Sequence, residues 1–201
     1  GVPAMYEGKL LFARAYAPSD TLLTDCRYIG YSTKATTNPG IIDCETGQIV
    51  VKCGGYTYLM EPKNGMVRYY IVEKKKTICG YHDLATNKDI QVAQFDGDLS
   101  KITFWTHGDF VGDKAPVNGT TWRFIDKSGN TVKEGYSKLL HSELGKLWVV
   151  WLQDGKTEAF TEDGQPVAFL TGYKNVLTNT DPANKMQYIV QNDQDKYGAL
   201  N

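Results

Sequence analysis

Three histidines are the first candidates for chemistry, because imidazole serves as a general base or as a metal ligand near neutral pH. His82 stands at an apolar position of a predicted strand, which favours a packed side chain. His107 and His141 lie beside Gly108 and Ser142 in predicted loops, where a solvated side chain is the ordinary state. We therefore assign no catalytic residue among them.

Four aspartates gather in one part of the sequence, at Asp96, Asp98, Asp109 and Asp113. Carboxylate oxygens suit calcium, and carboxylate pairs carry out glycoside hydrolysis. The spacing of an EF-hand is absent, and turns favour Asp and Gly for reasons of backbone geometry alone. The sequence accordingly predicts no metal ligand, no cofactor-binding residue and no cofactor.

Aromatic side chains offer a different kind of site, because flat rings stack on sugars or anchor a protein partner. Trp122, Trp148 and Trp151 coincide with apolar strands and are expected in the core. Trp105 lies at a strand end next to Thr106 and is the ligand-binding candidate.

The composition limits the class of partner. The chain of 201 residues has 22 basic and 23 acidic residues, and only Lys74, Lys75 and Lys76 form a basic run, so nucleic acid is not expected. Because no apolar stretch reaches the roughly 18 residues of a membrane span, no span is predicted.

The cysteines, Cys26, Cys44, Cys53 and Cys79, form no metal-binding pair; they suit one or two disulfides in an exported protein or buried thiols in a cytosolic one.

A short motif recurs along the chain and must position all of these residues. The motif consists of an aromatic or small residue, a glycine, two apolar residues and then Asp or Asn, as in Tyr197 to Asn201 at the end of the chain. Related copies end at residues 43, 83, 126 and 161. Tight turns follow the copies, where Asp bonds the backbone ahead and Gly accepts positive φ. The predicted structural turn residues are Asp43, Gly47, Asp83, Asp126, Gly129, Gly164 and Asn201.

Each copy opens a predicted unit of strand, tight turn, second strand, longer loop and strongly apolar strand. The second strand of the last full unit is expected at residues 165–170. The whole chain, 1–201, is expected to be one all-β repeat domain. Its units are predicted at 197–201 plus 1–38, 39–78, 79–121, 122–156 and 157–196.

The recurring motif resembles the WG (or KWG) β-repeats of bacterial proteins. The best matches are the segment from Trp122 through Asp126 to Gly129 and the segment from Lys196 to Gly198, although no copy contains the Trp-Gly pair itself. The resemblance implies tandem β-hairpin units in a protein that mediates interactions without catalysis. It transfers no functional residue.

The arrangement of the units has three alternatives. Joining residues 197–201 to residues 1–38 makes one further unit, so a small five-bladed β-propeller closed by the last strand is favoured. An open curved stack of β-repeats comes second, and a β-sandwich third. The stretch from Leu147 to Trp151 is apolar at every position, which indicates a strand covered by layers on both faces.

The function predicted from these features is a non-catalytic binding or interaction module with a protein or carbohydrate partner. The alternative is a secreted carbohydrate-active hydrolase or a carbohydrate-binding protein. The start at Gly1, Val2 and Pro3 is compatible with removal of a leader, so a periplasmic or extracellular location is preferred.

Overall fold

The computed structural model describes residues 3–6, 9–14, 28–32, 40–43, 45–96, 107–178 and 188–200. These residues form antiparallel strands in five sheets and no α-helix, so the predicted all-β class is confirmed. The chain divides into two compact units, residues 1–110 and 111–201, which are described separately. The assignment of the whole chain to one domain and the closed propeller both stay predictions.

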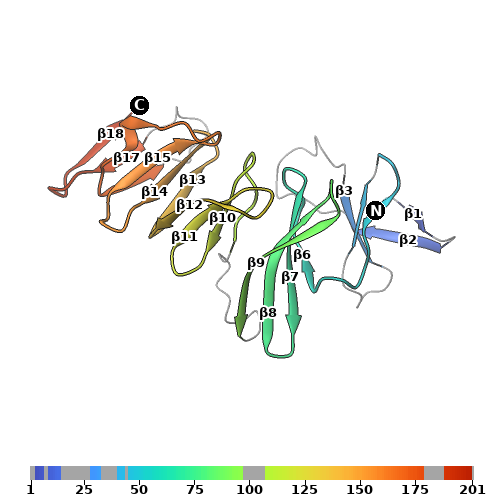
Figure 1. Ribbon diagram of the computed structural model, residues 1–201. Helices are drawn as coiled ribbons and strands as arrows, with labels where there is room; N and C mark the ends of the chain where they lie inside the picture. Colours follow the sequence, from blue (N-terminus) through green and yellow to red (C-terminus); the bar gives the residue numbers. More distant parts are fainter. Residues whose placement is uncertain are drawn as a thin grey trace. The chain divides into compact units, whose positions relative to one another are not determined.

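The first unit contains two antiparallel sheets (Figure 1). One sheet has the order β1-β2-β3-β4-β5 and the other the order β6-β7-β8-β9. Alternate side chains of the two sheets meet in an apolar cluster that includes Ile41, Val51, Val67 and Tyr69. The strands are β1 (Pro3–Tyr6), β2 (Lys9–Arg14), β3 (Tyr28–Ser32), β4 (Gly40–Asp43), β5 (Ile49–Val51), β6 (Tyr58–Leu59), β7 (Met66–Glu73), β8 (Lys76–Asp83) and β9 (Lys88–Asp96).

The second unit contains three sheets of three strands each, which follow one another as layers in Figure 1. A short 3₁₀ turn, η2 (Ala168–Leu170), lies between the last two sheets in the sequence. The strands are β10 (Ala115–Asn118), β11 (Trp122–Ile125), β12 (Thr131–Tyr136), β13 (Lys138–Ser142), β14 (Leu147–Trp151), β15 (Thr157–Thr161), β16 (Asn175–Thr178), β17 (Tyr188–Gln191) and β18 (Tyr197–Leu200).

Strand β14 is the middle of this stack and is buried on both faces, as its uninterrupted apolar sequence predicted. Leu147, Val149 and Trp151 pack in one cluster with side chains of the sheet β16–β18. Trp148 and Val150 point to the opposite face and pack in a second cluster with side chains of β11 and β12. Successive side chains of a strand alternate between its faces, so a strand between two layers needs an apolar residue at every position.

In the repeat turns, Asp side chains accept hydrogen bonds from backbone N–H groups just ahead of them in the sequence. The Oδ1 atom of Asp43 accepts the N–H of Glu45 at 2.9 Å, and Oδ1 of Asp126 accepts the N–H of Ser128 at 2.8 Å. Asp83 accepts the N–H of Ala85 in the same way. Positive φ angles occur at Gly47, Asn87, Gly129 and Gly164. The last predicted turn residue, Asn201, lies outside the described residues.

One expectation from the sequence needs correction. Residues 165–170 do not form a regular strand, because Pro166 contributes no N–H and makes only an isolated bridge with Phe160 before η2 begins. Strand β18 pairs with β17 across a short turn, and the joining of residues 197–201 to residues 1–38 stays a prediction.

Candidate functional site

The three histidines occupy three separate hydrogen-bonded clusters. His82 is buried on β8 and contacts Tyr56 and Asp89. Its Nδ1 atom lies 2.8 Å from Oδ1 of Asp89 and 3.0 Å from the hydroxyl of Tyr56, which itself donates to Asp89 at 2.6 Å. The carboxylate beside Nδ1 favours a proton on that nitrogen. His82 Nε2 is buried and meets no hydrogen-bonding atom in the described part of the chain.

The phenol of Tyr56 stays protonated in this cluster. Burial raises the pKa of Tyr56 far above its usual range, and the hydrogen bond to Asp89 raises it further. The side chain of Asp89 is about half exposed, so the cluster reaches the surface at that carboxylate. It ties the loop before β6 to strands β8 and β9.

His107 belongs to a second cluster, which holds residues 107–110 against the sheet β6–β9. Its Nε2 atom lies 3.1 Å from the carbonyl of Gly80, and its ring meets the edges of Tyr70 and Tyr81. Arg68 donates to the His107 carbonyl at 3.0 Å and pairs with Asp109 at 2.6 Å. Burial, with a smaller effect of the Arg68 charge, lowers the pKa of His107 to about 3, so the ring is neutral at physiological pH. The loop prediction placed this side chain in solvent, and that prediction is wrong.

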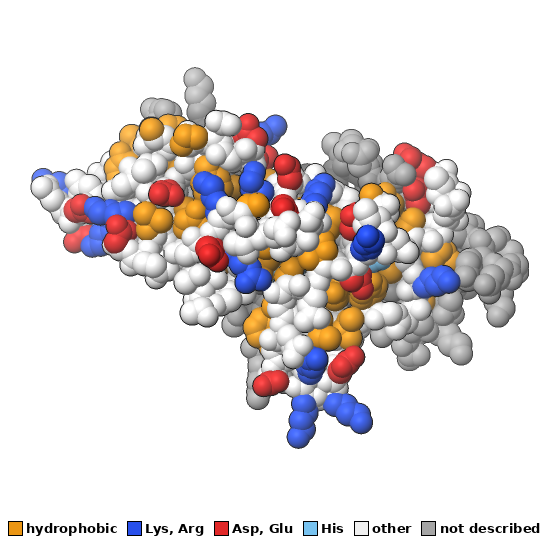
Figure 2. Space-filling view, in the orientation of Figure 1, with side chains coloured by type: hydrophobic (Ala, Val, Ile, Leu, Met, Phe, Trp, Pro, Cys, Tyr) orange, Lys and Arg blue, Asp and Glu red, His pale blue; other side chains and the backbone are white. Residues whose placement is uncertain are grey.

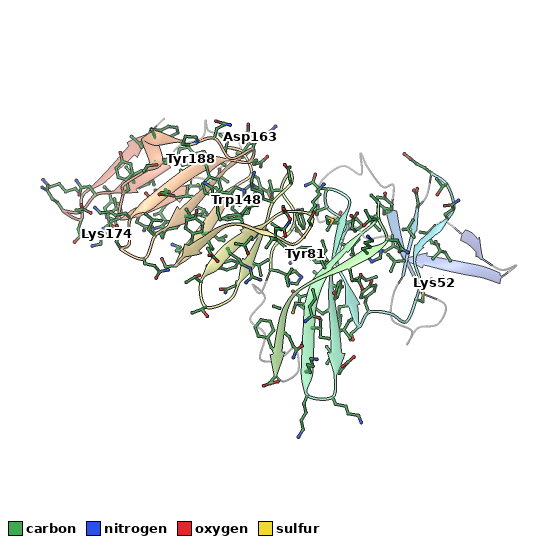
Figure 3. The ribbon with its side chains drawn as sticks, viewed as in Figure 1. Lys52, Tyr81, Trp148, Asp163, Lys174 and Tyr188 are labelled. Carbon is green, nitrogen blue, oxygen red and sulfur yellow. The ribbon has the colours of Figure 1, made fainter. Side chains whose placement is uncertain are left out.

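His141 forms the third cluster, on the sheet β13–β15. Its Nε2 atom lies 2.9 Å from Oε1 of Glu162, and its ring lies over the indole of Trp148 with centroids 4.3 Å apart. Figure 3 labels Trp148, which is buried on β14. The side chain of His141 is only partly exposed, so it is not the fully solvated loop residue that the sequence suggested.

The acidic residues do not converge on one histidine. Among the described residues, His82 meets Asp89, His141 meets Glu162, and Asp109 pairs with Arg68. No group of three or more His, Cys, Asp or Glu side chains suited to a metal occurs in the described ranges. Asp98 and the ligand candidate Trp105 lie outside these ranges, as do Cys26 and Cys44; Cys79 is buried and Cys53 is partly buried.

Three exposed apolar side chains of the second unit gather on one face of the sheet β16–β18. The strand register places two rows across this face, Leu177–Ile189–Ala199 and Asn175–Gln191–Tyr197. We call these six side chains the outer face. Leu177 is 46% exposed, Ile189 40% and Tyr197 64%, whereas Val176, Tyr188 and Val190 on the opposite face are buried in the core.

The outer face carries no charged side chain among its six positions. Charged residues stand at the strand ends instead, where Lys174 pairs with Asp195 and Lys156 with Asp193. Figure 2 shows apolar side chains at the surface of the C-terminal sheet. Exposed apolar side chains that gather on one rigid face are typical of interaction sites.

Sequence reasoning missed the outer face. Strands β16 and β17 are apolar on both faces, which the sequence shows, but the sequence cannot say which faces are covered. The stacking order decides that the residues Val176 and Val190 are buried while Leu177 and Ile189 are not.

Comparison with known proteins adds no functional information. No family model matches the chain, and no curated protein is similar to it. The computationally designed Ika8 protein is 13% identical, with 96% of this chain and 72% of that chain covered and a TM-score of 0.30. The designed Ika4 protein is 14% identical, with 73% of this chain and 90% of that chain covered and a TM-score of 0.34. The tricorn protease is 14% identical, with 89% of this chain and 19% of that chain covered and a TM-score of 0.38. Among the described residues, no helix has the length and hydropathy needed to cross a membrane.

Proposed function

We propose that this protein is a binding module whose stacked β-sheets hold the outer face of β16–β18 for a polypeptide partner. One observation carries the proposal: Leu177, Ile189 and Tyr197 are exposed side by side on a sheet whose other face is packed into the core. A partner that covers them gains the free energy of burying apolar surface.

The stacking of the sheets in the second unit also supports a binding role for the outer face. In the second unit, the sheet β13–β15 has a neighbouring layer on each side, and both of its faces are apolar. The sheet β16–β18 also has apolar residues on both faces but is covered on one. A rigid sheet loses little conformational entropy when its second face is covered, which favours association.

The partner is proposed to be a polypeptide because the outer face combines aliphatic side chains with Tyr197 and with the amides of Asn175 and Gln191. Interface centres are depleted in charged residues and enriched in aromatic ones. The resemblance to WG repeats, which implies an interaction role, agrees with this proposal and stays a prediction.

Site-specific photocrosslinking tests the proposal. A photoreactive amino acid replaces Ile189 in one variant and Val132, an exposed apolar residue on β12, in the control. We expect a crosslinked polypeptide at position 189 and not at position 132, and Leu177→Ser should weaken binding of that polypeptide after purification by about tenfold. Identical adducts at both positions, or unchanged binding by Leu177→Ser, would contradict the proposed surface.

A further inference from the structure

The chain contains two Asn-Gly pairs, and both lie in turns: Asn64-Gly65 before β7 and Asn118-Gly119 between β10 and β11. An Asn-Gly pair loses ammonia without any enzyme, because glycine has no side chain that keeps its backbone nitrogen away from the amide carbon of the preceding asparagine. In a folded chain, the rate of this reaction depends on how freely both residues move. The two pairs differ in this respect.

Asn64 is held by contacts of its side chain and of the turn around it. Its Nδ2 atom donates to the carbonyl of Phe110 at 2.6 Å. Two backbone hydrogen bonds between Lys63 and Met66, at 2.9 and 3.0 Å, close the turn. Attack on the amide carbon requires rotation of the Asn64 side chain, which would break its bond to Phe110.

The acceptor of the Asn64 amide is itself fixed, because residues 107–110 are bound to the sheet β6–β9. Phe110 is buried, and its ring meets that of Tyr81 edge to face with centroids 4.8 Å apart. The hydroxyl of Tyr81 donates to the carbonyl of Gly108 at 2.7 Å. The Asn64 amide therefore keeps its acceptor until this part of the first unit opens, and that opening costs free energy.

Asn118, the last residue of β10, has fewer restraints. Its side chain is partly exposed and makes no hydrogen bond in the part of the chain that the structure describes. The next two residues, Gly119 and Thr120, are exposed. The Gly119 N–H donates to the carbonyl of Thr121 at 3.1 Å, a contact inside the turn whose opening displaces no core side chain.

We propose that Asn118 is a site of spontaneous deamidation and that the fold protects Asn64 from the same reaction. The Gly119 backbone nitrogen loses its proton to solvent base and forms a bond to the Asn118 amide carbon, and the side-chain nitrogen leaves as ammonia. Water then opens the resulting succinimide ring at either carbonyl and gives isoaspartate or aspartate. In balance, one amide and one water become one carboxylic acid and one ammonia.

The isoaspartate product changes the backbone of the sheet β10–β12. Its main chain runs through the former side-chain CH2 group, so the connection between Asn118 and Gly119 becomes one carbon longer. Asn118 pairs with Trp122 across the turn, and the longer connection disturbs that pair. Trp122 packs against the buried cluster of Phe124 and Trp148. The reaction therefore loosens this end of the sheet as the protein ages, independently of the outer face.

Incubation of the full chain in mildly alkaline buffer, with and without guanidinium chloride, tests the assignment. Proteolysis and mass spectrometry measure the fraction of each asparagine converted to aspartate or isoaspartate. In the folded chain, Asn118 should convert at least about tenfold faster than Asn64. In the unfolded chain, where neither turn exists, the two rates should be similar, which separates the effect of the fold from that of the neighbouring residues.

Gly119→Ala is the matched variant at the reactive pair. The φ of Gly119 is not positive, and a Cβ atom there meets nothing closer than the Thr121 carbonyl oxygen at 3.7 Å, so the turn accommodates alanine. The added methyl group hinders the attacking nitrogen. Conversion of Asn118 should slow at least about tenfold, with unchanged circular dichroism.

Tyr81→Phe is the variant that tests the protection of Asn64. It removes the hydroxyl that donates to the Gly108 carbonyl and weakens the attachment of residues 107–110. Conversion of Asn64 should then accelerate about threefold or more, while that of Asn118 stays the same.

Two results would overturn the proposed site: equal conversion of Asn64 and Asn118 in the folded chain, or an intact Asn118 in the folded chain after the unfolded chain has fully converted. Unchanged conversion of Asn118 in Gly119→Ala would show that the Gly119 nitrogen is not the attacking group. An unchanged rate for Asn64 in Tyr81→Phe would reject residues 107–110 as the cause of its protection.

Discussion

Ala159 and Ala199 occupy equivalent positions in neighbouring sheets, yet Ala159 is buried and Ala199 is exposed. The difference arises from their surroundings, because both follow the same backbone turn. Ala159 has another segment along its strand edge and a layer over its side chain. In the described structure, Ala199 has neither.

The two-sided burial of β14 gives the first prediction. Val149→Ala removes two methyl groups from a fully buried site and should lower the free energy of unfolding of the second unit by about 2 to 3 kcal/mol. Val132→Ala, at an exposed site on β12, should change it by less than about 0.5 kcal/mol. Urea denaturation of both variants measures the difference, and equal effects would argue against the stack.

Gly80 gives the second prediction, because a Cβ atom there would lie 2.4 Å from the carbonyl oxygen of Ile90 and 2.4 Å from the hydroxyl of Tyr69. Gly80→Ala should destabilise the first unit by about 1 to 3 kcal/mol. Gly55 is the matched control, since a Cβ atom there meets nothing within 4 Å and its φ is not positive. A thermal melt in which the two variants coincide would contradict the close approach of β8 and β9.

The third prediction concerns pH and His107. Burial lowers the pKa of His107 to about 3 in the folded chain, whereas an unfolded histidine titrates near 6.5. The unfolded state therefore binds more protons between these values, so stability is fully present above about pH 6.5 and is lost as the pH falls toward 3.

The comparison for this prediction is His107→Gln, which keeps a donor for the Gly80 carbonyl but does not titrate. The variant should lose less stability than the natural chain between pH 7 and pH 4, as measured by urea denaturation across that range. Parallel curves for the two proteins would show that His107 is not held neutral by burial.

The sequence was most informative where a local pattern determines structure. An apolar residue at every position from Leu147 to Trp151 indicated a doubly covered strand, and β14 is one. Asp43 and Asp126 indicated turns because a short acidic side chain bonds the backbone just ahead of it, and both side chains do so.

Contacts between distant residues could not be predicted in this way. Tyr56 and Asp89 are 33 positions apart, and the pairing of strands within the sheet β6–β9 brings them to His82. The outer face was equally hidden, because Leu177 and Val176 have similar side chains and differ only in what lies over them. The strand expected at residues 165–170 did not form because the absent N–H of Pro166 outweighed the apolar pattern around it.

Amide hydrogen exchange tests the open edge of β18 most directly. In the isolated chain, the amide of Thr157 should exchange slowly, because it donates to Tyr173, while the amides of Tyr197 and Ala199 should exchange at rates near those of an unstructured peptide. If Tyr197 and Ala199 are as protected as Thr157 without any added partner, the edge of β18 is already occupied and its description as an open edge is wrong.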